Sequence, residues 1–174
     1  MRLPLFLLLV FILISNPSFA LDIEQAYRLI PYKQTPFILK QSKIPETEAD
    51  NVARLLSLTE LAMVERVEAM KYGPVKSQYR SQIDIILSQL EHLNPPQAIQ
   101  PPYQYILAAI QQHRGFFDLH GINDDRVKAE RKQLANASHR NLIAAYNLLM
   151  QRYPQETKHN KQAFFDYLCA LDFI

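Results

Sequence analysis

The sequence predicts an all-α protein, an up-and-down helical bundle with a four-helix core. Apolar residues recur at spacings of three and four, which is the period of an α-helix, and no sustained alternation typical of a strand is present. Prolines at positions 45, 74, 101, 102 and 154 divide the chain into segments of helical length, because proline lacks the amide hydrogen that a helix interior needs. Long helices joined by short connections pack against one another in antiparallel order.

The first twenty residues predict a secretory signal peptide, residues 1–20. One basic residue, Arg2, precedes an apolar run over 5–14, and small side chains at Ser18 and Ala20 mark a cleavage site after Ala20. The alternative is an N-terminal membrane anchor, but a spanning helix needs about 20 apolar residues and this run is half that length. We therefore expect a periplasmic or secreted protein whose residues 21–174 form a single helical-bundle domain.

The first elements of that domain are expected to be a short N-terminal helix over 22–30 and an extended segment over 31–43. A long helix should follow over 45–72, with Glu46 and Glu48 near the positive end of its dipole and Gly73-Pro74 ending it. Its apolar residues occupy more than one face, which predicts a central helix in contact with most of the others.

The next helix is expected over 74–93. One apolar stripe defines it, formed by Val75, Tyr79, Ile83, Ile86, Leu90 and Leu93. A stiff connection with four prolines, over 94–102, should lead to a helix that begins at Pro102 or Tyr103. Gly121 suits a left-handed cap after that helix.

The last two helices are expected over 123–153 and 158–173. Asn123, Asp124 and Asp125 are favoured residues at a helix N-terminus, and Pro154 ends the first of these segments. The second contains Cys169, the only cysteine of the chain, so no intrachain disulfide forms. Among apolar neighbours this cysteine is expected to be inert, with an intermolecular disulfide as the alternative.

Composition excludes several classes of function. The three glycines are too few for phosphate-cradling or dinucleotide-binding loops. The formal net charge of +2 argues against a nucleic-acid partner, which would require a strong basic excess. No transmembrane segment is expected after signal cleavage, because no second apolar run approaches spanning length.

The histidines are the candidate metal ligands. His113 and His120 are seven residues apart on one expected helix, two turns along one face, so a metal site would need a ligand from another helix such as His139. A haem between a histidine and Met63 or Met70 is a further alternative. Helix-end histidines and core methionines are the commoner interpretation, and we predict no cofactor.

No catalytic constellation stands out, and we predict that the protein is not an enzyme. A hydrolase with an unfamiliar site that uses Glu65 or Asp118 is the least favoured alternative. Aromatic residues gather in the second half of the chain, and several are adjacent pairs, of which one member can lie outside the core. These residues either pack under the N-terminal segments or line a ligand groove or a dimer face.

The function predicted on these grounds is non-catalytic binding, with another envelope protein as the expected partner. The alternative is a helical bundle that holds a small molecule, haem or a metal between its helices. The sequence leaves open whether the protein forms a homodimer.

Overall fold

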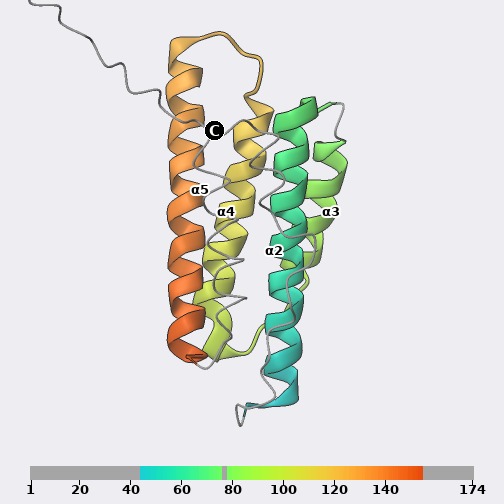
Figure 1. Ribbon diagram of the computed structural model, residues 1–174, viewed down its shortest axis with the longest axis vertical. Coiled ribbons are helices and arrows are strands. Elements are labelled where there is room, and N and C mark those ends of the chain that lie inside the picture. The colour runs from blue at the N-terminus through green and yellow to red at the C-terminus, as the bar shows by residue number, and fades with distance from the viewer. Residues whose placement is uncertain (1–43, 76–77, 155–174) are drawn as a thin grey trace, which may run out of the picture.

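Four helices packed side by side make up the part of the chain that the structure describes. The structure is a computed structural model, and it describes residues 44–75 and 78–154. Its helices, joined by turns, run alternately up and down (Figure 1) and are α2 (Glu46–Tyr72), α3 (Tyr79–Glu91), α4 (Gln100–Asp118) and α5 (Asp125–Arg152). The predicted all-α bundle is therefore confirmed. The predicted signal peptide, the segments over 22–30 and 31–43, and the helix over 158–173 lie outside the described residues.

α2 has the bounds that the sequence predicts. It begins at Glu46, directly after Pro45, and ends at Tyr72. Gly73 has φ 85° and ψ 150°, a backbone conformation that is open essentially to glycine alone, so the chain leaves the helix there. The buried residues of α2 contribute to both core clusters of the bundle, as a central helix should.

α3 begins later than predicted, at Tyr79 instead of residue 74. Gln78, just before it, has φ 56°, a left-handed conformation that interrupts a right-handed helix. Val75 was predicted to lie on the buried stripe, and this is wrong, because Val75 belongs to the turn and is 92% exposed. The remaining stripe is buried at Tyr79, Ile83, Ile86 and Leu90, as expected.

α4 begins earlier than predicted, at Gln100, after the short 3-10 helix η2 (Gln97–Ile99). Pro101 and Pro102 lie in its first turn, where the missing amide hydrogens are not needed, so they start the helix and do not delay it. Beyond its end, Gly121 has the positive φ expected of it, 84°.

α5 begins where the acidic residues predict. Asp124 is its N-cap, and its Oδ1 atom accepts hydrogen bonds from the backbone N–H groups of Arg126 and Val127 at 2.8 and 3.1 Å. α5 packs closely on α4 at Gly115, which has no side chain. A Cβ added to Gly115 would lie 3.3 Å from Leu134 Cδ1.

An ion pair between a buried carboxylate and a partly exposed arginine joins the start of α2 to the end of α5. Arg152 donates from Nε and Nη2 to the two carboxylate oxygens of Glu48 at 2.7 and 2.8 Å, and the Tyr153 hydroxyl donates to Glu48 Oε1 at 2.5 Å. The Arg152 hydrogen bonds hold the pKa of the Glu48 carboxyl below its usual range, against the opposing effect of burial. Glu48 therefore does more than face a helix dipole, the role predicted for it.

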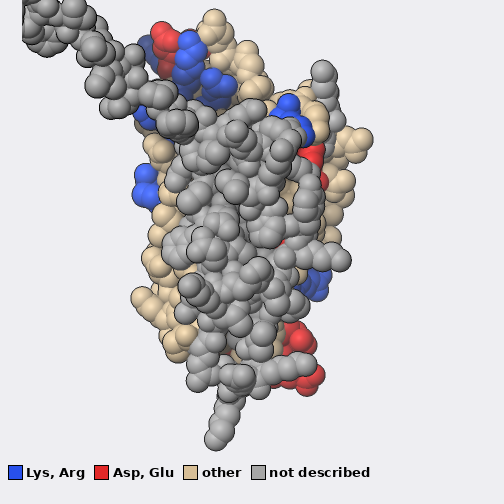
Figure 2. All heavy atoms as spheres, in the orientation of Figure 1, with Lys and Arg blue, Asp and Glu red and all other residues tan. Residues whose placement is uncertain are grey.

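The surface of the described bundle carries charges of both signs. At the end where α5 begins, Figure 2 shows basic and acidic side chains close together, in keeping with Asp124, Asp125, Arg126 and Lys128 at the start of that helix. Across residues 44–75 and 78–154, we find no helix with the length and apolar character that a membrane crossing requires.

Candidate binding site

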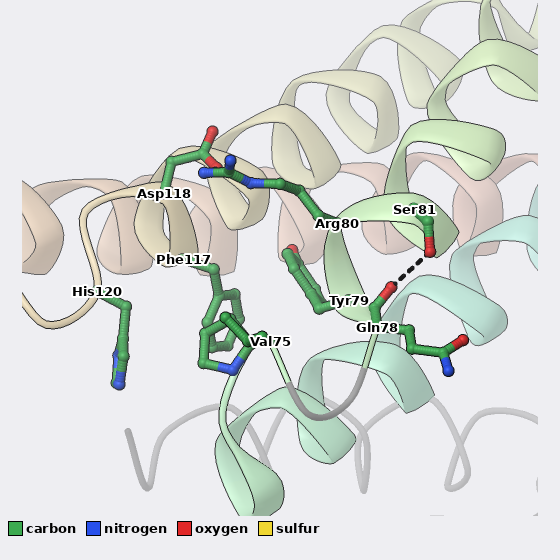
Figure 3. A pocket seen from close by; sticks show the side chains of 9 residues that line it. Val75, Gln78, Tyr79, Arg80, Ser81, Phe117, Asp118 and His120 are labelled. Carbon is green, nitrogen blue, oxygen red and sulfur yellow. Dashed lines mark hydrogen bonds and ion pairs between the residues drawn. The ribbon is translucent and has the colours of Figure 1, made fainter.

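A hollow of about 510 Å³ opens at the end of the bundle where α2 ends, α3 begins and α4 ends. Figure 3 shows the side chains around it. They come from the turn after α2, the first turn of α3 and the last turn of α4 with the residues after it. The lining is formed by Pro74, Val75, Gln78, Tyr79, Arg80, Ser81, Phe117, Asp118 and His120.

The local sequence accounts for the opening. Gly73 and Pro74 end α2. Because Gln78 has a left-handed conformation, α3 begins only at Tyr79. The hollow lies between the described residues of this turn and the end of α4. A helix that continued from residue 74, as the sequence predicted, would have carried Val75 into the core.

Two aromatic rings form the apolar floor. The centroids of the Tyr79 and Phe117 rings are 4.4 Å apart, with their planes tilted by 50°. Phe116 meets Phe117 edge-on at 5.0 Å, and the His120 ring lies 6.4 Å from that of Phe117. Tilted and edge-on contacts of this kind stabilise aromatic clusters and fix the orientation of the rings.

An ion pair forms one side of the hollow and connects α3 to α4. Arg80 donates from Nη2 and Nε to Asp118 Oδ1 at 2.6 and 3.1 Å. The other oxygen of Asp118 lies 3.8 Å from Arg114 Nε, which itself lies 3.2 Å from Asp84 Oδ1. Both oxygens of Asp118 thus face guanidinium groups already present in the protein.

The hydroxyl of Tyr79 is the unusual polar group of the site. The residue is 1% exposed, and its oxygen is buried without a hydrogen-bond partner. Figure 3 shows this oxygen at the end of the ring nearer Arg80 and Asp118. Burial raises the pKa of the phenol, so the group stays protonated and can donate a hydrogen bond.

The three candidate histidines lie in different surroundings. His113 is fully buried on α4, His120 is exposed at the hollow, and His139 is half-buried on α5. Within the described parts of the chain, no three His, Cys, Asp or Glu side chains gather as a metal would require. His159 and Cys169 lie outside those parts.

The two methionines considered as haem ligands pack in different places. Met63 belongs to the core cluster shared by α2 and α5, whereas Met70 lies against the cluster formed with α3 and α4. Among the two residues considered for hydrolysis, Asp118 is engaged with arginines. The pKa of Glu65 is raised by burial and by the neighbouring Glu68.

Sequence reasoning named Phe117 and Asp118 individually but did not find the hollow. Its formation depends on an exposed Val75 and a non-helical Gln78, and neither position carries a local signal for that conformation. Among the adjacent aromatic pairs, Phe116–Phe117 lies in the described residues, where Phe117 is buried and Phe116 is partly buried against the same core cluster. Of the two tyrosines of α4, Tyr105 is exposed, while Tyr103 is buried and donates to the Leu90 carbonyl at 3.0 Å.

No protein-family model, curated protein or solved structure matches this chain. Its function has to be inferred from the geometry of its own residues.

Proposed function

We propose that this chain is a non-catalytic binding protein of the cell envelope, and that the hollow is where another envelope protein docks. The observation that carries the proposal is the exposed apolar surface around the hollow. Val75, at its edge, is the most exposed of the large apolar residues described. Exposed apolar groups beside a concave aromatic surface are typical of binding sites.

The same end of the bundle exposes two further apolar side chains. Tyr72 ends α2, and Ile122 lies in the connection from α4 to α5. With Val75 they are three exposed apolar side chains at this end of the bundle. A protein surface can cover all three positions and the hollow at once, whereas a small molecule would occupy the hollow alone.

Site-specific photo-crosslinking tests the docking position. A photoreactive amino acid is placed at residue 75 of the full-length chain in living cells, and a matched control carries it at Ile85. Ile85 is 51% exposed on α3, outside the lining of the hollow. We expect one discrete protein adduct from position 75 and none from position 85.

A second pair of variants makes the result specific. With the photoreactive group at Ile122, the Val75→Asp substitution should abolish the adduct, whereas Ile85→Asp should leave it intact. Val75 is almost fully exposed, so its substitution should not disturb the fold. Adducts of equal yield from positions 75 and 85, or an adduct unaffected by Val75→Asp, would contradict the proposal.

A bound small molecule is the second candidate, and the volume of the hollow favours it. About 510 Å³ falls in the range of ordinary small-molecule sites. Native mass spectrometry of the protein recovered from the envelope fraction distinguishes the two. An added mass of an organic molecule, haem or metal supports this candidate, and the bare mass of residues 21–174 supports a protein partner.

A further inference from the structure

We infer that the hollow takes a carboxylate carried on an apolar residue, namely the free C-terminal carboxylate of a partner whose last side chain is apolar. The inference rests on the proposed function, because it names the part of the partner that docks. It follows from the two kinds of surface that meet at Tyr79.

The apolar surface is the floor formed by Tyr79 and Phe117, with Val75 at its edge. Both rings are held by packing, since Tyr79 and Phe117 are buried in the core cluster shared by α2, α3 and α4. Only a small part of each ring therefore reaches the hollow, and Pro74 and Val75 supply the rest of its apolar lining.

The polar surface offers hydrogen-bond donors. The Tyr79 hydroxyl is buried without a partner, and Arg80 uses two of its N–H groups on Asp118, which leaves others of the five that a guanidinium carries. α3 begins here without a side-chain cap and without an acidic residue in its first turn. The positive end of the helix thus adds to the donors.

Acceptors are already engaged on this side of the hollow. Asp118 is the one carboxylate of the lining, and it faces Arg80 and Arg114. The Ser81 hydroxyl donates its hydrogen to the Gln78 carbonyl at 2.9 Å, drawn as the dashed line in Figure 3. The carboxylate of the lining is thus neutralised by arginines of the protein, and a negatively charged acceptor on a ligand makes the strongest hydrogen bonds with the donors of the site.

A C-terminal residue fits both surfaces because its carboxylate and its side chain leave the same Cα atom. The ring of Tyr79 belongs to the apolar floor, and the hydroxyl of the same side chain is the hydrogen-bond donor. The apolar group and the acceptor of a ligand that contacts both must therefore also be close together. An internal Asp or Glu carries the carboxylate without an apolar group on the same residue. Capture of a terminal carboxylate by backbone and side-chain donors is a known mode of peptide recognition.

The probe is N-acetyl-L-phenylalanine, with N-acetyl-L-phenylalaninamide as the matched uncharged ligand. Each is titrated into ¹⁵N-labelled protein produced from the full-length gene, and the amide signals of Tyr79, Arg80 and Ser81 are followed. We expect the acid to shift these signals and the amide to bind at least tenfold more weakly. A short Gly/Ser peptide that ends in a free phenylalanine carboxylate should bind as the acid does.

Variants connect the binding to the donors. Tyr79→Phe and Arg80→Gln should each weaken the acid several-fold and leave the affinity of the amide unchanged. The controls are Tyr105→Phe, an exposed tyrosine of α4, and Arg54→Gln, an exposed arginine of α2, and neither should change the affinity. Tyr79→Phe keeps the ring and removes the hydroxyl alone, so it tests the donor even if Arg80→Gln loosens the contact between α3 and α4.

Each contrary result overturns a defined part of the reasoning. If the acid and the amide bind equally, the site does not recognise a carboxylate. The docking position itself is then decided by the crosslinking test alone. Acid binding that survives both Tyr79→Phe and Arg80→Gln overturns the assignment of the donors. If the amino-acid derivative binds and the peptide does not, a small carboxylic acid is the ligand and the C-terminal partner is refuted.

Discussion

Replacement of His113 tests the account of the bundle interior most directly. His113 lies on α4 with no exposed surface, and neither of its ring nitrogens has a hydrogen-bond partner. Burial, and then the positive charge of Arg66, lower its pKa well below the ordinary value of 6.5. The folded protein therefore holds this imidazole neutral, while the unfolded chain takes up a proton near pH 6.5.

The sign and size of the effect follow from this difference. A neutral His113 causes no pH dependence above pH 6.5, but below it the unfolded chain binds one more proton and is favoured. The free energy of unfolding then falls by about 1.4 kcal/mol per pH unit, until the folded pKa is reached. Between pH 7.5 and 5.5, the titration of His113 alone should lower the free energy of unfolding by about 1.4 kcal/mol, which is a sizeable part of a typical total stability.

His113→Leu removes both the titration and the buried polar atoms without partners. We expect the variant to be more stable than the original protein by about 1–3 kcal/mol at pH 7.5, because the desolvation penalty of the ring disappears. The difference should grow by about 1.4 kcal/mol at pH 5.5. Urea denaturation at the two pH values measures both quantities.

His120→Asn is the matched control, since His120 is exposed and its replacement should leave the free energy of unfolding at pH 7.5 unchanged. If His113→Leu loses as much stability between pH 7.5 and 5.5 as the original protein does, His113 is not the group responsible. A variant less stable than the original at pH 7.5 would refute the reasoning that the buried ring is a cost to the fold.

Other substitutions test the remaining parts of the structure. Glu48→Gln should cost about 1–3 kcal/mol near neutral pH in urea denaturation, because the charge-assisted hydrogen bonds are weakened. Since the pKa of Glu48 is lowered on folding, that cost should be full above pH 4.5 and vanish as pH falls through the folded pKa. Gly73→Ala should cost about 1–3 kcal/mol by the same assay, because φ there is positive, whereas Gly115→Ala inside α4 should stay within about 1 kcal/mol. Leu56→Ala and Ile86→Ala should each cost about 2–5 kcal/mol as buried core positions, and unchanged melting temperatures would show that their helix faces are wrongly assigned.

The helices could be predicted from the sequence where the chain marks their ends strongly. Gly73-Pro74 ends α2 and Asp124 begins α5, because each residue has a backbone or hydrogen-bonding property that a helix interior does not accommodate. The start of α3 could not be predicted. Gln78 adopts a left-handed conformation that no property of glutamine favours, so a continuous apolar stripe misassigned Val75.

The candidate site and the Glu48–Arg152 ion pair required the structure for a different reason. Glu48 and Arg152 are far apart in the sequence, and their pairing depends on which helix ends meet. The hollow likewise brings the turn after α2 to the end of α4. Periodicity shows which face of a helix is buried, but it does not show which residues of other helices that face meets.

Ion pairs between helices connect the two halves of the described bundle. α2 and α3 form one helical hairpin, and α4 and α5 form another. The ion pairs Glu48–Arg152 and Arg80–Asp118 each connect one hairpin to the other. These two ion pairs lie at opposite ends of the bundle. Glu48–Arg152 joins the start of α2 to the end of α5, and Arg80–Asp118 joins the start of α3 to the end of α4 (Figure 1). Arg80–Asp118 forms part of the hollow, whereas Glu48–Arg152, of which only the carboxylate is buried, lies away from it. An occupant that draws Arg80 away from Asp118 therefore removes one connection between the hairpins, while Arg114–Asp84 and Glu48–Arg152 still join them.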